Sequence, residues 1–157
     1  MDPIEKAVKK SGELFASGYC CAEAVLMAMA EAQGVQSELI PRIATGFCAG
    51  IARRGDICGA LSGAIMGINL AFGRNSSDKP RDKDYAAVSE LMKQFEQKFS
   101  SSDCRDLTGC DLTTPEGRKA FEVNNIKEQC NLYCREATRI AMVQIEKIDA
   151  GLVGGSE

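Results

Sequence analysis

Residues 57–72 read Ile-Cys-Gly-Ala-Leu-Ser-Gly-Ala-Ile-Met-Gly-Ile-Asn-Leu-Ala-Phe, with no charged side chain. Gly59, Gly63 and Gly67 recur every fourth residue, so they lie on one face if the segment is helical. Glycines at this spacing let a second helix backbone approach closely. The segment is shorter than the ~20 apolar residues that a membrane-spanning helix requires. We therefore predict a buried central helix that does not span a membrane.

Apolar residues at helical spacing predict further helices on both sides of this segment. Asp2 followed by Pro3 is typical of a helix start, and Gly34 is typical of a helix end. The predicted helices cover approximately residues 3–17, 20–33, 37–44, 57–72, 81–99 and 126–148. In the helix over 81–99, the expected inner face consists of Tyr85, Val88, Met92, Phe95 and Phe99.

The segments 46–55 and 100–115 are expected to be loops. No run of alternating β-branched residues indicates a strand. The fold prediction is all-α: a compact bundle of five or six helices around a glycine-lined central helix. We expect residues 1–150 to form a single helical domain and residues 151–157 to form a flexible C-terminal tail.

The composition excludes several function classes. The 157 residues carry a net charge of −3 and include eight cysteines but no histidine. An acidic chain lacks the basic surface of a nucleic-acid-binding protein. The absence of histidine rules out Ser-His-Asp catalysis, histidine-ligated zinc and histidine-ligated haem, and it also excludes the c-type haem motif. The N-terminus lacks a secretory pattern, so we expect a cytoplasmic protein.

In a reducing compartment, eight cysteines favour metal ligands or redox thiols over permanent disulfides. Cys58 opens the predicted central helix, where the helix dipole and free N–H groups favour a thiolate. Cys20 and Cys21 lie in the first turn of an earlier helix. Cys58 and Cys21 are therefore candidate redox thiols. The alternative is that the cysteines are small apolar residues of the core.

The other cysteines are spread along the chain. Cys104 and Cys110 share a predicted loop, and Cys130 and Cys134 lie one helical turn apart in the last helix. The sequence contains no Cys-x-x-Cys, which argues against a thioredoxin site, a zinc ribbon and a bacterial ferredoxin. Any metal site must therefore collect its ligands from distant segments.

Several motifs together resemble a known family of redox-active proteins with four characteristic cysteines, the C_GCAxxG_C_C family. They occur in the expected order: Cys21-Ala22-Glu23-Ala24-Val25, Gly46-Phe47, Cys58-Gly59-Ala60-Leu61-Ser62-Gly63 and Cys104-Arg105-Asp106-Leu107-Thr108-Gly109. The resemblance implies a primary ligand set of Cys21, Cys58, Cys104 and Cys130. Cys20, Cys48, Cys110 and Cys134 are then secondary candidates, and Cys48 departs from the small residue usual in the family.

The resemblance implies a small redox protein whose primary cysteines bind an iron–sulfur cluster or exchange disulfides, since four thiolates suit such a cluster. A related module looks like part of split-Soret cytochromes, but this chain lacks their haem signature. Family genes often lie beside transporter genes, which implies a redox partner protein or a transporter component as partner.

Two alternatives stay open at this point. One is a zinc- or copper(I)-binding module or sensor, because thiolates select soft ions. The other is a non-catalytic helical partner with structural cysteines. Whether the protein is an enzyme stays open, and the glycine-lined helix offers a contact face for an oligomer.

Overall fold

The glycine-rich segment forms a buried helix, α4 (Gly59–Phe72), in the computed structural model, which describes residues 1–152. The helix begins after Cys58, which takes the N-cap position, and Ile57 pairs with Asp103 in an isolated β-bridge. No helix within residues 1–152 combines the length and the apolar character needed to cross a membrane. The predicted buried central helix is therefore confirmed.

The glycine face of α4 packs on α2 (Cys21–Ala32) of the same chain. A Cβ atom at Gly63 would lie 2.6 Å from the carbonyl oxygen of Ala22, and a Cβ atom at Gly67 would meet the side chain of Met29. The glycines therefore allow close backbone approach between these two helices. This face of α4 is filled within the chain, and a role for the helix in an oligomer stays a prediction.

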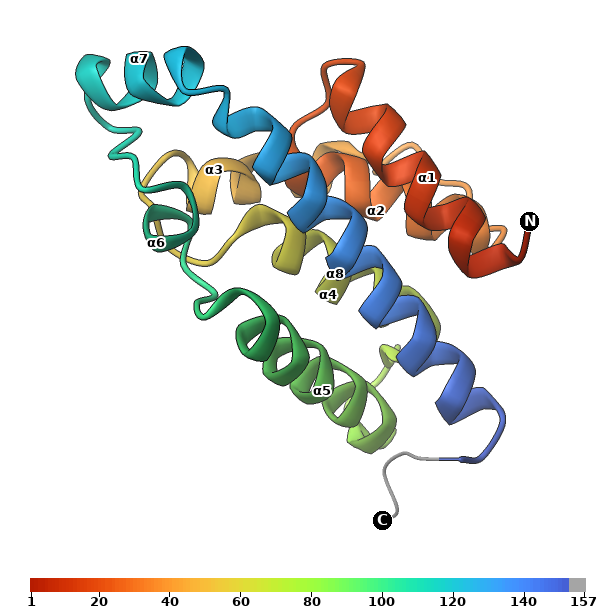
Figure 1. Cartoon of the computed structure of the whole chain (residues 1–157). Helices are drawn as coiled ribbons and strands as arrows, with labels where there is room; N and C mark the ends of the chain where they lie inside the picture. The colour runs from red at the N-terminus through yellow and green to blue at the C-terminus, as the bar shows by residue number, and fades with distance from the viewer. Residues whose placement is uncertain (153–157) are drawn as a thin grey trace.

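The longest helix, α8 (Ile126–Asp149), packs against α1 (Pro3–Ala16), α2, α4 and α5 (Asp82–Phe99). Figure 1 shows α8 running diagonally, with α1 on one side and α5 on the other. The side chain of Asp2 caps α1 by accepting hydrogen bonds from the N–H groups of Ile4 (2.8 Å) and Glu5 (3.2 Å).

The interface between α5 and α8 contains three aromatic rings. The ring centroids of Phe95 and Phe99 lie 4.8 Å apart, and those of Phe99 and Tyr133 lie 4.9 Å apart. Phe95 is fully buried, whereas Tyr85 is 59% exposed, so the prediction that Tyr85 belongs to the inner face was wrong. The buried face of α5 instead consists of Ala87, Leu91 and Phe95 at a four-residue spacing.

Short helices connect the long ones: the 3₁₀ helix η1 (Arg42–Phe47), α3 (Cys48–Ile51), α6 (Cys104–Thr108) and α7 (Pro115–Val123). The predicted helix over 37–44 was wrong, because residues 38–41 form a turn. Ile40 precedes a proline, a position that disfavours the α conformation, and helical structure begins only after Pro41.

The helix α6 lies within the segment 100–115 that was expected to be a loop, and α7 begins at the end of that segment. The all-α prediction is nevertheless confirmed, since residues 1–152 contain helices and no strand. The single domain over 1–150 stays a prediction. Of the expected tail at 151–157, residues 153–157 lie outside the described residues.

Candidate functional site

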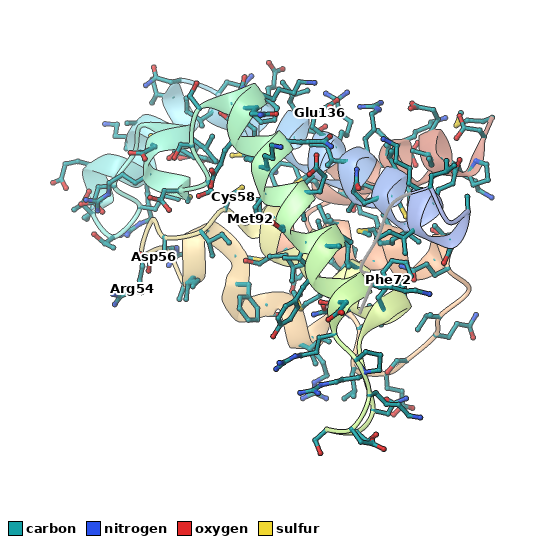
Figure 2. The ribbon with its side chains drawn as sticks, turned by 90° about the horizontal axis from the view of Figure 1, so that it is seen from below. Arg54, Asp56, Cys58, Phe72, Met92 and Glu136 are labelled. Atoms are coloured by element: carbon teal, nitrogen blue, oxygen red, sulfur yellow. A yellow bond between two sulfur atoms is a disulfide. The ribbon has the colours of Figure 1, made fainter. Side chains whose placement is uncertain are left out.

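A cavity of about 460 Å³ opens where the ends of several helices meet. Its lining includes six of the eight cysteines: Cys20, Cys21, Cys48, Cys58, Cys104 and Cys130. The four primary candidates thus share one cavity although they come from α2, the start of α4, α6 and α8. Figure 2 shows Cys58 at the inner end of a loop from which Arg54 and Asp56 point outward.

The sulfur of Cys21 lies among backbone N–H groups from three helices. Burial raises the pKa of Cys21, and the nearby backbone N–H groups of Ala22, Ala49 and Gly59 lower it only in part, so the net pKa is raised. The sulfur also fills the space beside Gly59, where a Cβ atom would collide with it. Gly59 therefore allows α4 to begin directly against the Cys21 thiol.

Cys58 is buried at the N-cap of α4. The N–H groups of Ala60 and Leu61 lower its pKa, as expected for a thiol at a helix start. Burial raises the pKa more strongly, and the neighbouring thiol of Cys21 adds to the increase, so the net pKa lies well above its usual value. The N–H groups at the helix start thus act on Cys58 in the expected direction, but burial reverses the net shift of its pKa.

The other two primary cysteines have raised pKa values for the same reason. Burial, followed by the nearby thiol of Cys21, raises the pKa of Cys104 to about 11. Burial, then Cys21 and Cys104, raise the pKa of Cys130 to about 12. A thiol with such a pKa is overwhelmingly protonated at neutral pH unless a cation compensates the thiolate charge.

One wall of the cavity includes a left-handed turn over residues 49–53. All five residues have positive φ angles, from 49° at Ala52 to 74° at Arg53, and only Gly50 is a glycine. Left-handed backbone is unfavourable for residues with a Cβ atom, by about 1–2 kcal/mol each. Backbone hydrogen bonds hold the turn, from Ala52 N–H to Gly46 O (3.1 Å) and from Asp56 N–H to Gly50 O (2.9 Å).

Gly50 brings this turn against α6. A Cβ atom there would lie 2.5 Å from the Cβ atom of Cys104 and 2.9 Å from the backbone of Asp56. The N–H of Cys104 also donates to the Asp56 carbonyl (2.7 Å). The turn therefore positions the beginning of α6, and with it the Cys104 thiol.

Two secondary candidates, Cys20 and Cys48, form a disulfide with a Cα–Cα distance of 5.9 Å. Within residues 1–152, these two sulfurs and a carboxylate oxygen of Glu23 are the only three potential metal-ligand atoms within 4.8 Å of one another. Glu23 also accepts hydrogen bonds from the N–H of Cys20 (3.1 Å) and the hydroxyl of Thr45 (2.6 Å).

The remaining secondary candidates, Cys110 and Cys134, are buried free thiols that are not part of the cavity lining. Cys134 lies in the core beside the backbone of Cys21, and the sulfur of Cys110 lies 3.5 Å from the carbonyl oxygen of Thr108. Cys110 still contributes to the electrostatic environment of the site, since its thiol raises the pKa of Cys104 and Cys130.

Sequence reasoning missed part of the lining. Arg118 and Phe121 come from α7, which was not predicted. A usable signal was present, because Thr114 caps α7 by accepting from Gly117 N–H (2.9 Å) and Pro115 occupies the first helical position. Arg53 and Lys127 complete the cationic part of the lining.

The fold and the cavity describe a small helical protein with a cysteine-lined interior site. Residues 19–144 match the family described as "Putative redox-active protein (C_GCAxxG_C_C)", and the chain belongs to this family. The family name writes the central motif with glycine before cysteine, whereas Cys58 precedes Gly59 here.

A relative from Archaeoglobus fulgidus, described as "Uncharacterized protein", is 31% identical over 129 residues, which cover 76% of this chain and 85% of the relative. No solved structure matches the chain. The family and the Cys20–Cys48 pair together support a cysteine-based redox protein.

Proposed function

We propose that this protein is a redox protein that binds an iron–sulfur cluster through Cys21, Cys58, Cys104 and Cys130. The observation that carries the proposal is that these four cysteines, drawn from distant segments, line one cavity of about 460 Å³. Four cysteine thiolates are the usual ligand set of [2Fe–2S] and [4Fe–4S] clusters. A bound cluster would supply one-electron transfer.

The spacing of the thiols favours a cluster over a single ion. A tetrahedral zinc ion with Zn–S distances of about 2.3 Å holds its four sulfurs about 3.8 Å apart. Within residues 1–152, no three of the primary thiols lie within 4.8 Å of one another. A cluster spans a wider ligand set than one zinc ion, so the cavity suits it better.

The electrostatics of the site also favour metal ligation over nucleophilic thiol exchange at Cys58. Its pKa is raised by burial, so the free thiolate that would attack a disulfide is scarce. A positively charged iron centre compensates buried thiolates. The N–H groups directed at the sulfurs of Cys21 and Cys58 stabilise negative charge there, and such bonds tune the reduction potential of a cluster.

The test is anaerobic reconstitution of the full chain with ferrous iron and sulfide, followed by iron and sulfide analysis and visible absorption. We expect stoichiometric iron and sulfide and a coloured protein. Alanine at Cys21, Cys58, Cys104 or Cys130 should each reduce bound iron by more than half.

Cys110→Ala and Cys134→Ala are matched controls, because both replace a buried thiol that does not line the cavity. They should retain the iron of the unmodified chain. A colourless, iron-free protein would contradict the proposal. Stoichiometric zinc without sulfide would instead favour the soft-metal module, and unchanged partner binding after loss of all four cysteines would favour the helical partner.

We also propose a cytoplasmic location and a redox partner protein or transporter component as the partner. The net charge of −3 argues against nucleic acid as a partner, because nucleic-acid-binding proteins present a basic surface.

A further inference from the structure

The Cys20–Cys48 disulfide lies outside the four-cysteine set, yet both of its residues line the same cavity. It joins the N-cap residue of α2 to the first residue of α3. The Cα–Cα distance of 5.9 Å is within the usual range for a disulfide. Cys20 is the more accessible of the two, since it is half-buried whereas Cys48 is buried.

A second connection joins α2 to η1, the helix that ends one residue before Cys48, without the sulfur–sulfur bond. Glu23, on α2, accepts from the N–H of Cys20 with one carboxylate oxygen and from the hydroxyl of Thr45, on η1, with the other. These bonds do not involve the sulfurs, so they can persist when the disulfide is reduced. The two thiols then stay close enough to form the disulfide again, as a reversible redox pair requires.

The cavity beside this disulfide has a cationic lining in an acidic protein. Arg53, Arg118 and Lys127 contribute three positive charges to the lining, and Glu122 contributes one negative charge. The carboxylate of Glu23 lies outside the lining and within 4.8 Å of the two disulfide sulfurs, so the cations exceed the nearby carboxylates by one. The three cationic side chains are exposed, so they can meet a solute as it enters. Opposite charge at a partly enclosed site raises the local concentration and the association rate of an anionic solute.

We propose that Cys20 and Cys48 form a thiol–disulfide exchange site for a small thiol that carries a carboxylate group. The thiolate of the incoming molecule attacks the Cys20 sulfur, the Cys20–Cys48 bond breaks, and Cys48 leaves as a thiolate that takes up a proton. A second molecule of the thiol attacks the mixed disulfide and releases Cys20. The protein disulfide gains two electrons and two protons, and two small thiols become one small disulfide.

This site needs no iron, so its test is independent of the proposed cluster. The full chain with its disulfide intact is treated with 3-mercaptopropionate or with cysteamine, two small thiols that differ in carrying a carboxylate or an ammonium group. The comparison uses equal thiolate concentrations at low ionic strength, and each rate is divided by the rate of the same thiol with a small uncharged disulfide, because a more basic thiolate is intrinsically a stronger nucleophile. The rates compared below are these normalised rates. Samples are quenched with acid and alkylated, and the free Cys20 and Cys48 thiols are measured by peptide mass spectrometry.

We expect 3-mercaptopropionate to reduce the disulfide at least tenfold faster than cysteamine. The preference should fall at high salt, which screens exposed charges. It should also fall in the triple variant Arg53→Gln, Arg118→Gln, Lys127→Gln. Equal rates, or faster reduction by cysteamine, would overturn the anionic substrate class. A disulfide that resists both thiols until the chain is unfolded would overturn the exchange site itself.

Single variants test which sulfur is attacked. With the disulfide of 3-mercaptopropionate, Cys20 in Cys48→Ser should form a mixed disulfide faster than Cys48 does in Cys20→Ser. The reverse order would contradict attack at Cys20. Cys110 serves as an internal control in every digest, since it is a buried thiol outside the cavity lining and should stay unmodified.

Discussion

Gly59 is the position where the helix packing and the cysteine site meet, so Gly59→Ala perturbs both. The added Cβ atom would collide with the sulfur of Cys21 and would lie 3.1 Å from the carbonyl oxygen of Phe47 and 3.3 Å from the N atom of Ala22. Two of these neighbours are backbone atoms, which cannot rotate away. Either the Cys21 side chain leaves its position or α4 moves away from α2.

The expected cost follows from overpacking, which typically destabilises by about 1–3 kcal/mol. Alanine recovers part of this through its better helix propensity, up to about 1 kcal/mol in a helix interior and less at the first helical position. We therefore expect a net loss near 1–2 kcal/mol in the free energy of unfolding. For a chain of this length, that lowers Tm by about 2–8 °C.

The assay combines urea unfolding of the reduced, metal-free chain with iron and sulfide analysis after reconstitution. Gly63→Ala is the matched variant, because its Cβ atom would meet Ala22 and Val25 on α2 but no cysteine. Both variants should lose stability, and only Gly59→Ala should lose bound iron. Gly46→Ala should change neither, since a Cβ atom there meets nothing within 4 Å. Wild-type stability and iron content in Gly59→Ala would refute the reasoning.

The thiols and the charged side chains lead to four further predictions. The raised pKa values of Cys104 (about 11) and Cys130 (about 12) leave thiolate fractions on the order of 10⁻³ and 10⁻⁴ at pH 8. Iodoacetamide should therefore label these two residues in reduced, metal-free protein at least a hundredfold more slowly than it labels a free cysteine. Because the pKa values of these thiols are higher in the folded than in the unfolded chain, the free energy of unfolding in urea should be greatest below about pH 8.5 and should fall as the pH rises toward 11–12. Labelling at the rate of a free cysteine would contradict the first expectation, and a flat pH profile of stability would contradict the second. Glu23→Ala should lower the effective concentration of the Cys20 and Cys48 thiols and make their disulfide easier to reduce, by about 30 mV for each tenfold change in that concentration. Glu23→Gln should restore the reduction potential because glutamine keeps a polar bridge. Equal potentials for both variants in a glutathione redox titration would show that the bridge is unimportant. Arg139→Ala removes the ion pairs of Arg139 to Glu5 and Glu136, but Lys98 still pairs with Glu136. The variant should therefore cost about 1 kcal/mol in thermal unfolding and leave iron binding unchanged, and an unaltered Tm would argue against this expectation.

The parts of the fold that were predictable depend on short-range patterns. The glycine repeat of α4, the Asp2 cap of α1 and the four-residue apolar spacing of α5 are all visible within one or two helical turns. Even there, periodicity did not decide which face is covered: Tyr85 matches the spacing but is exposed. Burial depends on which neighbouring helix covers each position, and local spacing does not contain that information.

The candidate site depends on long-range geometry. Cys20 pairs with Cys48, 28 residues away, and the left-handed turn over residues 49–53 follows directly after Cys48. The four non-glycine residues of that turn have no intrinsic preference for the left-handed conformation, so propensity gives no signal for it: Ala49, Ile51, Ala52 and Arg53. The pKa of Cys58 shows the same limit: its place at a helix start was predictable, but the burial that dominates its pKa was not.

The distribution of the cysteines has a consequence for the order of events during biosynthesis. Cys21 and Cys58 meet early, on two helices that pack directly on each other, but Cys130 comes from α8. Until α8 has left the ribosome and packed across α1, α2, α4 and α5, the nascent chain presents exposed thiols without an enclosing cavity. Loading of any cofactor must therefore follow synthesis of α8.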